Sequence, residues 1–402
     1  MAKPSEDSAP ERSALVLCPE APYPVVGGGA LRTASILDYL TPRYKVDVIV
    51  FREPEAPDPA PSFPAGGPRT VSVINLPHHS KTPQARAARN LIRFLKGCPP
   101  LNDRFSGFAA EVSRCLAQRP YDLALIEHFW CAPYREQIAP HAARTILDLH
   151  NIESVLYART AALEPWPVSA LFRRFAAAAS SLERQWIPRF SSVLVASEQD
   201  AEQVRRLAPG AAVVVYPNSI PAVPRPPVRE TEAIAFSGNL EYRPNISGVR
   251  FFRNEVWPIL RERWPMLRWQ VVGKNPGAVA GEVAGDPRIE LIGPVEDAVA
   301  TLAAARVVVV PLLTGSGTRV KILEAWAAGR AVVSTSIGAE GLGARDGEHL
   351  LVADTAEAFA EAVSRLLASA EQRQRIGAAG RALYEERFTW NRAWDTLAEV
   401  GI

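Results

Sequence analysis

Short apolar runs rich in β-branched residues alternate with stretches of helical periodicity along most of this chain. Continuous apolar runs of this kind are typical of parallel strands whose two faces are both covered. The pattern predicts strands at 14–18, 46–51, 121–127, 144–150, 192–196, 212–216, 233–236, 267–272, 289–292, 307–310 and 331–335. It predicts helices at 30–40, 82–118 with a break near 97–100, 169–186, from 197 onward, 245–263, 298–305, 321–328, 356–368, 371–386 and 391–400, and an irregular Pro-rich loop at 52–70.

A proline-rich segment that begins at residue 217 interrupts this alternation. A chain of 402 residues is long enough for two domains, and strands that alternate with helices predict doubly wound sheets. We therefore predict an α/β protein with two doubly wound Rossmann-like domains that face each other across a cleft. The predicted segments are a disordered leader at 1–13, an N-terminal domain at 14–216, a linker at 217–232, a C-terminal domain at 233–386, and a C-terminal helix at 387–402 that packs back on the N-terminal domain.

A glycine-rich turn in the second half has the composition of a ligand-binding loop. Gly315-Ser316-Gly317 lets the backbone turn tightly, and Thr318 is a natural N-cap for the helix that follows. Free N–H groups and the positive helix end favour an anion there, and Arg319 and Lys321 add two cations. Glu324 lies about one turn further along the helix. This combination suits a sugar nucleotide, although spacing alone equally allows a core strand–helix–strand unit with solvated charges.

A triple glycine, 27–29, follows the first predicted strand in the N-terminal half. Doubly wound sheets bind ligands at such carboxyl ends. The sequence does not match GxGxxG, however, and no acidic residue ends the second strand at the spacing that a dinucleotide site requires. An NAD-linked dehydrogenase is therefore disfavoured.

Composition narrows the function further. A net charge of +2 and a pI near 8.4 do not favour nucleic acid as a partner. The four cysteines lack CxxC spacing, so neither a zinc site nor a disulfide framework is expected. The N-terminus has no apolar signal region, and no apolar run approaches the ~18 residues of a spanning helix. We expect a cytoplasmic protein.

Within the predicted helical region, residues 85–96 combine cations with large apolar side chains. A basic amphipathic helix of this kind can lie on an anionic membrane, so peripheral contact with the inner membrane surface is one interpretation. The other interpretation is that this face of the helix is simply exposed to solvent. The residues concerned are Arg86, Arg89, Arg93 and Lys96, and Leu91, Ile92, Phe94 and Leu95.

An ordered set of short motifs resembles the GT-B glycosyltransferases, specifically glycosyltransferase family 4 and its exopolysaccharide branch. Each motif is weakly specific alone, but the set follows the family's order over roughly residues 14–390. The matching segments lie at 148–153, 195–200, 216–218, 236–239 with 242–245, 315–324 and 333–342.

The resemblance implies transfer of a sugar from a nucleotide donor to a glycan or lipid-linked acceptor in polysaccharide or glycoconjugate biosynthesis, with retention at the anomeric carbon. It implies a nucleotide site in the C-terminal domain and an acceptor site in the N-terminal domain. UDP is the expected nucleotide, with GDP next. The acceptor side is expected to involve the loop at 52–70 and the segment 127–130, whose aromatic residues either stack on a sugar or pack in the core.

Residue roles follow from the same resemblance. Glu324 is expected to accept hydrogen bonds from the ribose, and His150 to orient the donor sugar and support developing positive charge as the catalytic residue. The expected diphosphate-binding residues are Arg319, Lys321, Gly317, Thr318, Gly28 and Gly29. Asn218 and Asn239 are further candidates for the cleft.

Two departures from common family patterns affect this interpretation. Ser316 stands where many members have the first of two glutamates, so the sugar contact of that glutamate is in doubt. The chain also has no Asp-x-Asp pair. We therefore expect a metal-independent reaction without a cofactor, in which Arg319 and Lys321 neutralise the diphosphate. A sugar-nucleotide epimerase of the same fold and a non-catalytic sugar-nucleotide-binding protein stay open as alternatives.

Overall fold

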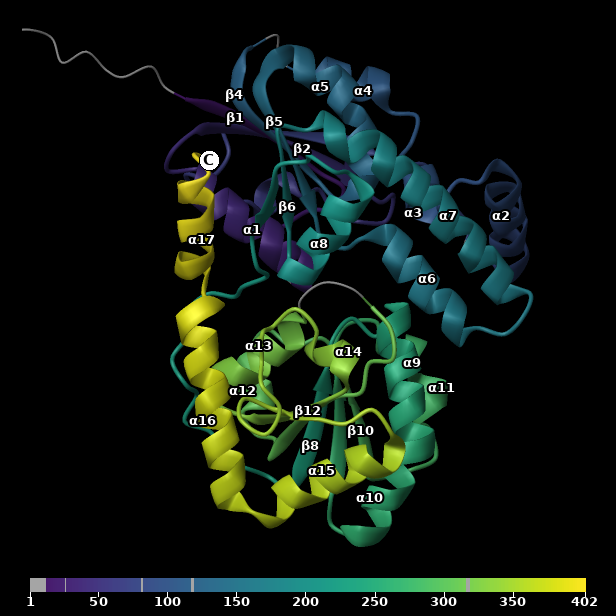
Figure 1. Ribbon diagram of the computed structural model, residues 1–402, viewed down its shortest axis with the longest axis vertical. Coiled ribbons are helices and arrows are strands. Elements are labelled where there is room, and N and C mark those ends of the chain that lie inside the picture. Colours follow the sequence, from purple (N-terminus) through teal and green to yellow (C-terminus); the bar gives the residue numbers. More distant parts are fainter. Residues whose placement is uncertain (1–11, 26, 81, 117–118, 316–318) are drawn as a thin grey trace, which may run out of the picture. The chain divides into compact units, whose positions relative to one another are not determined.

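The computed structural model of the chain describes residues 12–25, 27–80, 82–116, 119–315 and 319–402. It divides into two compact units (Figure 1). The first unit comprises residues up to Val195, with Ala201–Val215 and Leu397–Ile402, and the second comprises Ala196–Asp200 and Tyr216–Thr396. Most of the predicted leader lies outside the described residues, but its last residue, Ser13, already belongs to the first strand.

The first unit is built on a seven-stranded sheet in the order β3-β2-β1-β4-β5-β6-β7, and every pairing described in it is parallel. The central strands are mostly apolar and buried, as expected when helices cover both faces. The strands are β1 (Ser13–Cys18), β2 (Lys45–Arg52), β3 (Thr70–Asn75), β4 (Tyr121–Glu127), β5 (Ala142–Leu149), β6 (Ser192–Val195) and β7 (Val213–Val215).

Helices surround this sheet (Figure 1). They are α1 (Gly28–Leu40), α2 (Pro83–Lys96), α3 (Pro100–Arg104), α4 (Ala109–Cys115), α5 (Arg135–Ile138), α6 (Glu153–Leu163), α7 (Val168–Trp186) and α8 (Glu198–Leu207). The chain end also belongs to this unit, because Tyr39 Oη donates to the carbonyl of Ile402 and Arg144 donates to that of Gly401.

The second unit contains a six-stranded parallel sheet in the order β10-β9-β8-β11-β12-β13. Its strands are β8 (Ala233–Ser237), β9 (Arg268–Val272), β10 (Ile289–Ile292), β11 (Val307–Val310), β12 (Ala331–Ser334) and β13 (Leu351–Val352). Its helices are α9 (Arg243–Phe251), a π-helical turn (Phe252–Val256), α10 (Trp257–Arg263), α11 (Ala280–Val283), α12 (Ala298–Leu302), α13 (Val320–Ala327), α14 (Ser336–Ala339), α15 (Ala356–Ala368), α16 (Ala370–Arg387) and α17 (Trp390–Glu399).

The fold confirms two parallel α/β sheets and differs from the sequence prediction in local detail. The segment after the predicted loop at 52–70 forms β3, and α6 was not predicted. Helix α1 begins at Gly28 instead of residue 30, so two of the three glycines lie in its first turn. Gly27, the residue before the helix, has φ 96°, a conformation that favours glycine.

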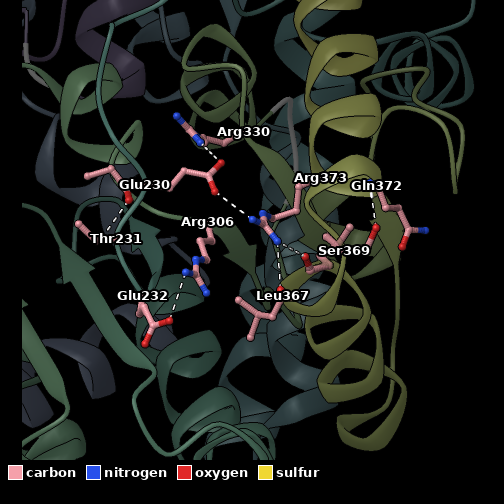
Figure 2. A network of polar contacts seen from close by, with 11 residues as sticks. Glu230, Thr231, Glu232, Arg306, Arg330, Leu367, Ser369, Gln372 and Arg373 are labelled. Atoms are coloured by element: carbon pink, nitrogen blue, oxygen red, sulfur yellow. Dashed lines mark hydrogen bonds and ion pairs between the residues drawn. The ribbon is translucent and has the colours of Figure 1, made fainter.

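The proline-rich segment after β7 is attached to the second unit along its length. Tyr384 Oη donates to the carbonyl of Pro221, and Arg381 donates to that of Val223. Figure 2 shows the end of this segment, where Glu230 lies between Arg330 and Arg373. Because these two arginines are largely shielded from water, the carboxylate of Glu230 compensates their positive charge. The residues predicted as a linker, 217–232, are thus part of the second unit.

Candidate functional site

Each sheet has one position where its connections change direction. In the first unit, the chain runs from β1 outward to β3 and then returns to β4 on the other side of β1. In the second unit, β8 and β11 have the same relation. Crevices open at the carboxyl ends of such strand pairs, and doubly wound proteins bind ligands there. The sequence-predicted site residues follow these ends.

In the second unit, two glycines bring backbone segments unusually close beyond β8 and β9. A Cβ atom on Gly273 would lie 1.8 Å from the carbonyl oxygen of Gly238. A Cβ atom on Gly238 would lie 2.8 Å from both Asn245 Nδ2 and Lys321 Nζ. Larger residues would therefore displace the backbone or the side chains around Lys321.

Lys321 is 9% exposed, and its ammonium group lies within this cluster. Its Nζ donates to Asn245 Oδ1 at 2.7 Å and lies 4.2 Å from the ring centroid of Phe236. Burial lowers the pKa of Lys321 to about 7, and the positive charge of Arg319 adds to this effect, while Glu324 opposes it. A bound anion would restore the charged form, because an opposite charge favours ionisation.

Glu324 lies on the same helix, α13, and accepts a hydrogen bond from Ser237 Oγ at 3.4 Å. Burial raises its pKa to about 7, although Lys321 partly offsets this. The carboxylate and the ammonium thus both lie where their charged forms are disfavoured. A ligand with hydroxyl donors and phosphate oxygens would satisfy both groups.

Arg319 is the residue before the first turn of α13 and is 8% exposed. Its guanidinium packs against Gly315, where a Cβ atom would lie 2.7 Å from Nη2. The prediction that Thr318 is the N-cap was wrong, because the helix begins at Val320 and Arg319 holds that position. Ser316, Gly317 and Thr318 themselves lie outside the described residues.

Asn245 joins the predicted Asn239 to the cluster, since its Nδ2 donates to the Asn239 carbonyl at 2.7 Å while its Oδ1 accepts from Lys321. Asn245 was within the 242–245 motif but was not assigned a role. Its position two residues into α9, which begins at Arg243, is the signal that identifies it. The predicted Asn218 is partly buried in the segment after β7.

In the first unit, His150 lies between two buried carboxylates. Its Nε2 is 2.6 Å from Glu127 Oε2 and 3.2 Å from Asp148 Oδ2. The sheet explains this arrangement, because Glu127 and Asp148 are register partners at the ends of β4 and β5. His150 follows Asp148 by two residues, and side chains two apart along an extended strand point to the same face.

Arg32, on α1, completes the cluster. It is 1% exposed and holds Asp148 with Nε–Oδ2 at 2.7 Å and Nη2–Oδ1 at 2.5 Å. Burial alone would raise the pKa of Asp148, but the Arg32 guanidinium and the hydrogen bond with His150 hold it well below its usual range. Sequence reasoning missed this residue. The available signal was a cation in an otherwise buried stretch of the helix after the glycines.

The two carboxylates determine the protonation of His150. Burial by itself lowers the pKa of His150, but its hydrogen bonds with Asp148 and Glu127, and their charges, raise it to about 9. Burial and the charge of Asp148 raise the pKa of Glu127. His150 is therefore an imidazolium near neutral pH. It can donate a hydrogen bond and place positive charge near a leaving group, but it is not a nucleophile.

Gly29 and His128 flank His150. A Cβ atom on Gly29 would lie 3.8 Å from His150 Nδ1, so the structure brings together two residues predicted from sequence. Gly28 occupies the first position of the same helix. The His128 ring lies 3.7 Å from that of His150 and stacks on Trp130 at 4.2 Å. Trp130 is 9% exposed, so core packing accounts for this aromatic residue.

Glu127, Asp148 and His150 each offer one atom within 4.8 Å of the others, a spacing that a metal ion can bridge. The donor set fits a metal poorly, however. The Arg32 guanidinium already neutralises Asp148, and an imidazolium at His150 has no lone pair to give. We therefore assign no metal to this cluster.

A family model described as "Glycosyl transferases group 1" matches residues 231–369, which contain the Lys321–Glu324 site. A Klebsiella pneumoniae protein described as an uncharacterized 44.6 kDa protein in the cps region is 22% identical over 362 residues. That similarity covers 86% of this chain and 89% of the relative.

Solved structures share the fold over nearly the whole chain. Sucrose-phosphate synthase from Thermosynechococcus elongatus superposes with a TM-score of 0.68 at 17% identity, covering 97% of this chain and 98% of that one. Anabaena HepE, solved with UDP and glucose, gives 0.67 at 14% identity, covering 97% and 99%. Staphylococcus aureus TarM, solved with UDP among its ligands, gives 0.67 at 9% identity, covering 96% and 99%. These similarities establish the GT-B fold.

Across the described part of the chain, no helix combines the length and the apolarity that crossing a membrane requires.

Proposed function

We propose that this chain, which has the GT-B fold and matches the group 1 glycosyltransferase model over residues 231–369, is a retaining glycosyltransferase that uses a nucleotide-sugar donor, with UDP favoured. The acceptor is a glycan or a lipid-linked glycan in polysaccharide or glycoconjugate biosynthesis, and the enzyme works in the cytoplasm. The observation that carries this proposal is the pairing of Lys321 and Glu324 at the carboxyl end of the second sheet, where burial disfavours both charges.

The second unit binds the nucleotide in this proposal. Glu324 accepts hydrogen bonds from both ribose hydroxyls, and its pKa falls as those donors replace water. Lys321 and Arg319 contact the diphosphate. Charge grows on the diphosphate as the glycosidic bond breaks, so fixed cations there stabilise the transition state more than the ground state.

The first unit acts on the donor sugar. His150 donates a hydrogen bond to a sugar hydroxyl, and its two carboxylates balance positive charge that develops at the anomeric carbon. Glu127 Oε1 is buried and has no hydrogen-bond partner among the described residues, so it is available to accept from the same sugar. Gly29, which follows Gly28 in the first turn of α1, leaves room beside His150 for the donor.

The reaction is proposed to be metal-independent. Two cations in the second unit suffice to offset the charge of a bound diphosphate, and the carboxylate cluster of the first unit carries its own cations. Two comparisons support the substrate class: HepE was solved with UDP and glucose, and the Klebsiella relative is described as lying in the cps region.

A nucleotide-binding screen tests the proposal directly. Thermal unfolding is measured with UDP, GDP, ADP and CDP, and with EDTA present throughout. A ligand at ~100 times its Kd stabilises the native state by ~2.7 kcal/mol, which is easily detected as a rise in Tm. We expect UDP to give the largest rise, and Glu324→Gln to reduce it. Absence of any shift with the whole panel would overturn the proposal.

A second measurement separates transfer from isomerisation. The enzyme is incubated with the preferred nucleotide sugar alone and then with a glycan acceptor, and the anomeric configuration of the product is read by NMR. We expect sugar transfer with the donor's configuration kept. Conversion of the donor to an epimer without acceptor would contradict the transferase.

A further inference from the structure

Helix α2 (Pro83–Lys96) faces the solvent with its apolar side. Leu91, Ile92 and Leu95 are 60%, 50% and 70% exposed. Its one buried residue is Arg93, which is 9% exposed and forms an ion pair with Asp103, Nε–Oδ2 2.8 Å. A helix on the surface of a globular protein normally does the opposite, burying its apolar stripe and exposing its charges. In this inverted orientation the fold leaves the apolar face of α2 uncovered.

The helix is a defined element, not a frayed segment. Thr82 caps its start by accepting from the Ala85 N–H, and Gly97 ends it in the left-handed conformation with φ 62°. It packs beside α7 at the margin of the first unit in Figure 1. Leu163, the last residue of α6, is 48% exposed, and Trp166 in the connection to α7 is 82% exposed. Exposed apolar clusters of this kind mark interaction surfaces.

The charge of α2 indicates what covers it. The helix has no acidic residue, and besides the buried, ion-paired Arg93 it contains three cations, Arg86, Arg89 and Lys96. A second copy of the chain would bring two such basic helices together, and like charges repel. An anionic bilayer complements both features, because its headgroups attract the cations while its acyl region takes up the leucines. We propose that α2 docks the enzyme peripherally on an anionic lipid bilayer, with Leu91, Ile92 and Leu95 inserted.

Vesicle co-sedimentation of the full chain tests this docking. The probes are vesicles of phosphatidylcholine alone and of phosphatidylcholine with one-third phosphatidylglycerol. We expect at least tenfold tighter binding to the anionic vesicles, and weaker binding in high salt as the attraction is screened. The double variant Leu91→Ser and Leu95→Ser should lose at least tenfold in affinity. Met266→Ser, which removes a 74% exposed apolar side chain from the second unit, is the matched control and should bind normally.

The substituted side chains are exposed, so the variants should keep the wild-type Tm and nucleotide-induced shift, which separates membrane docking from donor binding. Equal vesicle binding by the double variant would overturn the proposal, as would binding that ignores lipid charge and salt. A dimer of the wild-type chain that the double variant abolishes would also overturn it, because the covering partner would then be a second copy.

Discussion

The two units share a parallel α/β architecture, but they hold the buried charges of their sites in opposite ways. In the first unit, Arg32, Asp148, His150 and Glu127 form a continuous chain of ion pairs. In the second unit, Lys321 contacts a neutral amide and Glu324 a hydroxyl, and burial shifts both pKa values to about 7. The first cluster is extensively ion-paired without ligand, and among its described atoms Glu127 Oε1 is left to accept a hydrogen bond. The second cluster is arranged to bind a ligand.

This difference predicts opposite effects on stability. Removing a member of an ion-paired network leaves an uncompensated buried charge, which destabilises the fold. Removing a charge that burial already disfavours should leave stability unchanged or increase it, at the expense of function. Four measurements test this contrast, in order of decreasing effect.

The largest effect is expected from Arg32→Ala. The substitution leaves Asp148 buried without its bidentate partner, and the free energy of unfolding should fall by about 3–5 kcal/mol in denaturant titrations. Arg114→Ala removes a 74% exposed arginine from the same unit and should change stability by less than about 0.5 kcal/mol. Similar stability of the two variants would mean that the first cluster is not a stabilising network.

Lys321→Met should weaken nucleoside diphosphate binding by about 100-fold, or ~2.7 kcal/mol, without lowering the unfolding free energy at pH 7. Because the pKa of Lys321 is lowered to about 7 in the folded protein, its charged form disfavours the fold. The wild-type protein therefore loses stability as the pH falls from ~10.5 through about 7, and methionine removes that loss. Calorimetric titration with UDP measures the affinity. Arg365→Ala, an exposed arginine on α15, is the control. A stability loss as large as that of Arg32→Ala would remove the contrast between the units.

Glu324→Gln should make the ligand-free protein more stable at pH 8 than the wild type, by about 1–2 kcal/mol, since the side chain is partly exposed and partly screened. Because the pKa of Glu324 is raised to about 7 in the folded protein, the ionised carboxylate disfavours the fold. The wild-type protein therefore loses stability as the pH rises from ~4.5 through about 7. The difference in Tm between the two proteins should therefore shrink from pH 8 to pH 5. A difference that is independent of pH would contradict a buried, ionising carboxylate.

The smallest effect concerns His150. Its pKa is raised to about 9, so its contribution to stability is complete below pH ~6.5 and disappears as the pH rises through about 9. His150→Gln should be less stable than the wild type by about 1–2 kcal/mol at pH 6.5 and nearly equal to it at pH 10. Parallel Tm profiles measured between these pH values would show that His150 is not the titrating cation of the cluster.

Much of the fold was predictable because apolar runs in buried parallel strands are continuous and strongly patterned. Val307–Val310 and Ala331–Ser334 illustrate this, and both were located within one residue. Strand β3 was missed because it lies at the edge of its sheet and is only partly buried, so its sequence is less apolar. Helix α6 follows directly after the 148–153 motif, and its apolar periodicity is weak.

The site was predictable where its residues lie close together in sequence. Arg319, Lys321 and Glu324 share one helix start. His150 follows the end of β5, and Gly29 lies in the first turn of the helix that follows β1, both near the switch point of the sheet. Glu127 and Asn245 lay within the predicted segments 127–130 and 242–245 but were given no separate role. Arg32 was missed because its partner is distant in sequence. Arg32 and Asp148 are 116 residues apart, and only the order of the strands brings them together.

The contact between Gly238 and Gly273 limits how this enzyme can be redesigned. Donor preference can be altered by changing the size of side chains around a nucleotide. A methyl group at Gly273, however, would overlap the backbone of Gly238, and one at Gly238 would displace the side-chain ends of Asn245 and Lys321. A library that varies both glycines independently would consist mainly of proteins in which Asn245 and Lys321 have moved. Variation is better directed to Asn239 and Asn275, which hydrogen-bond to each other on the exposed side of the same loops.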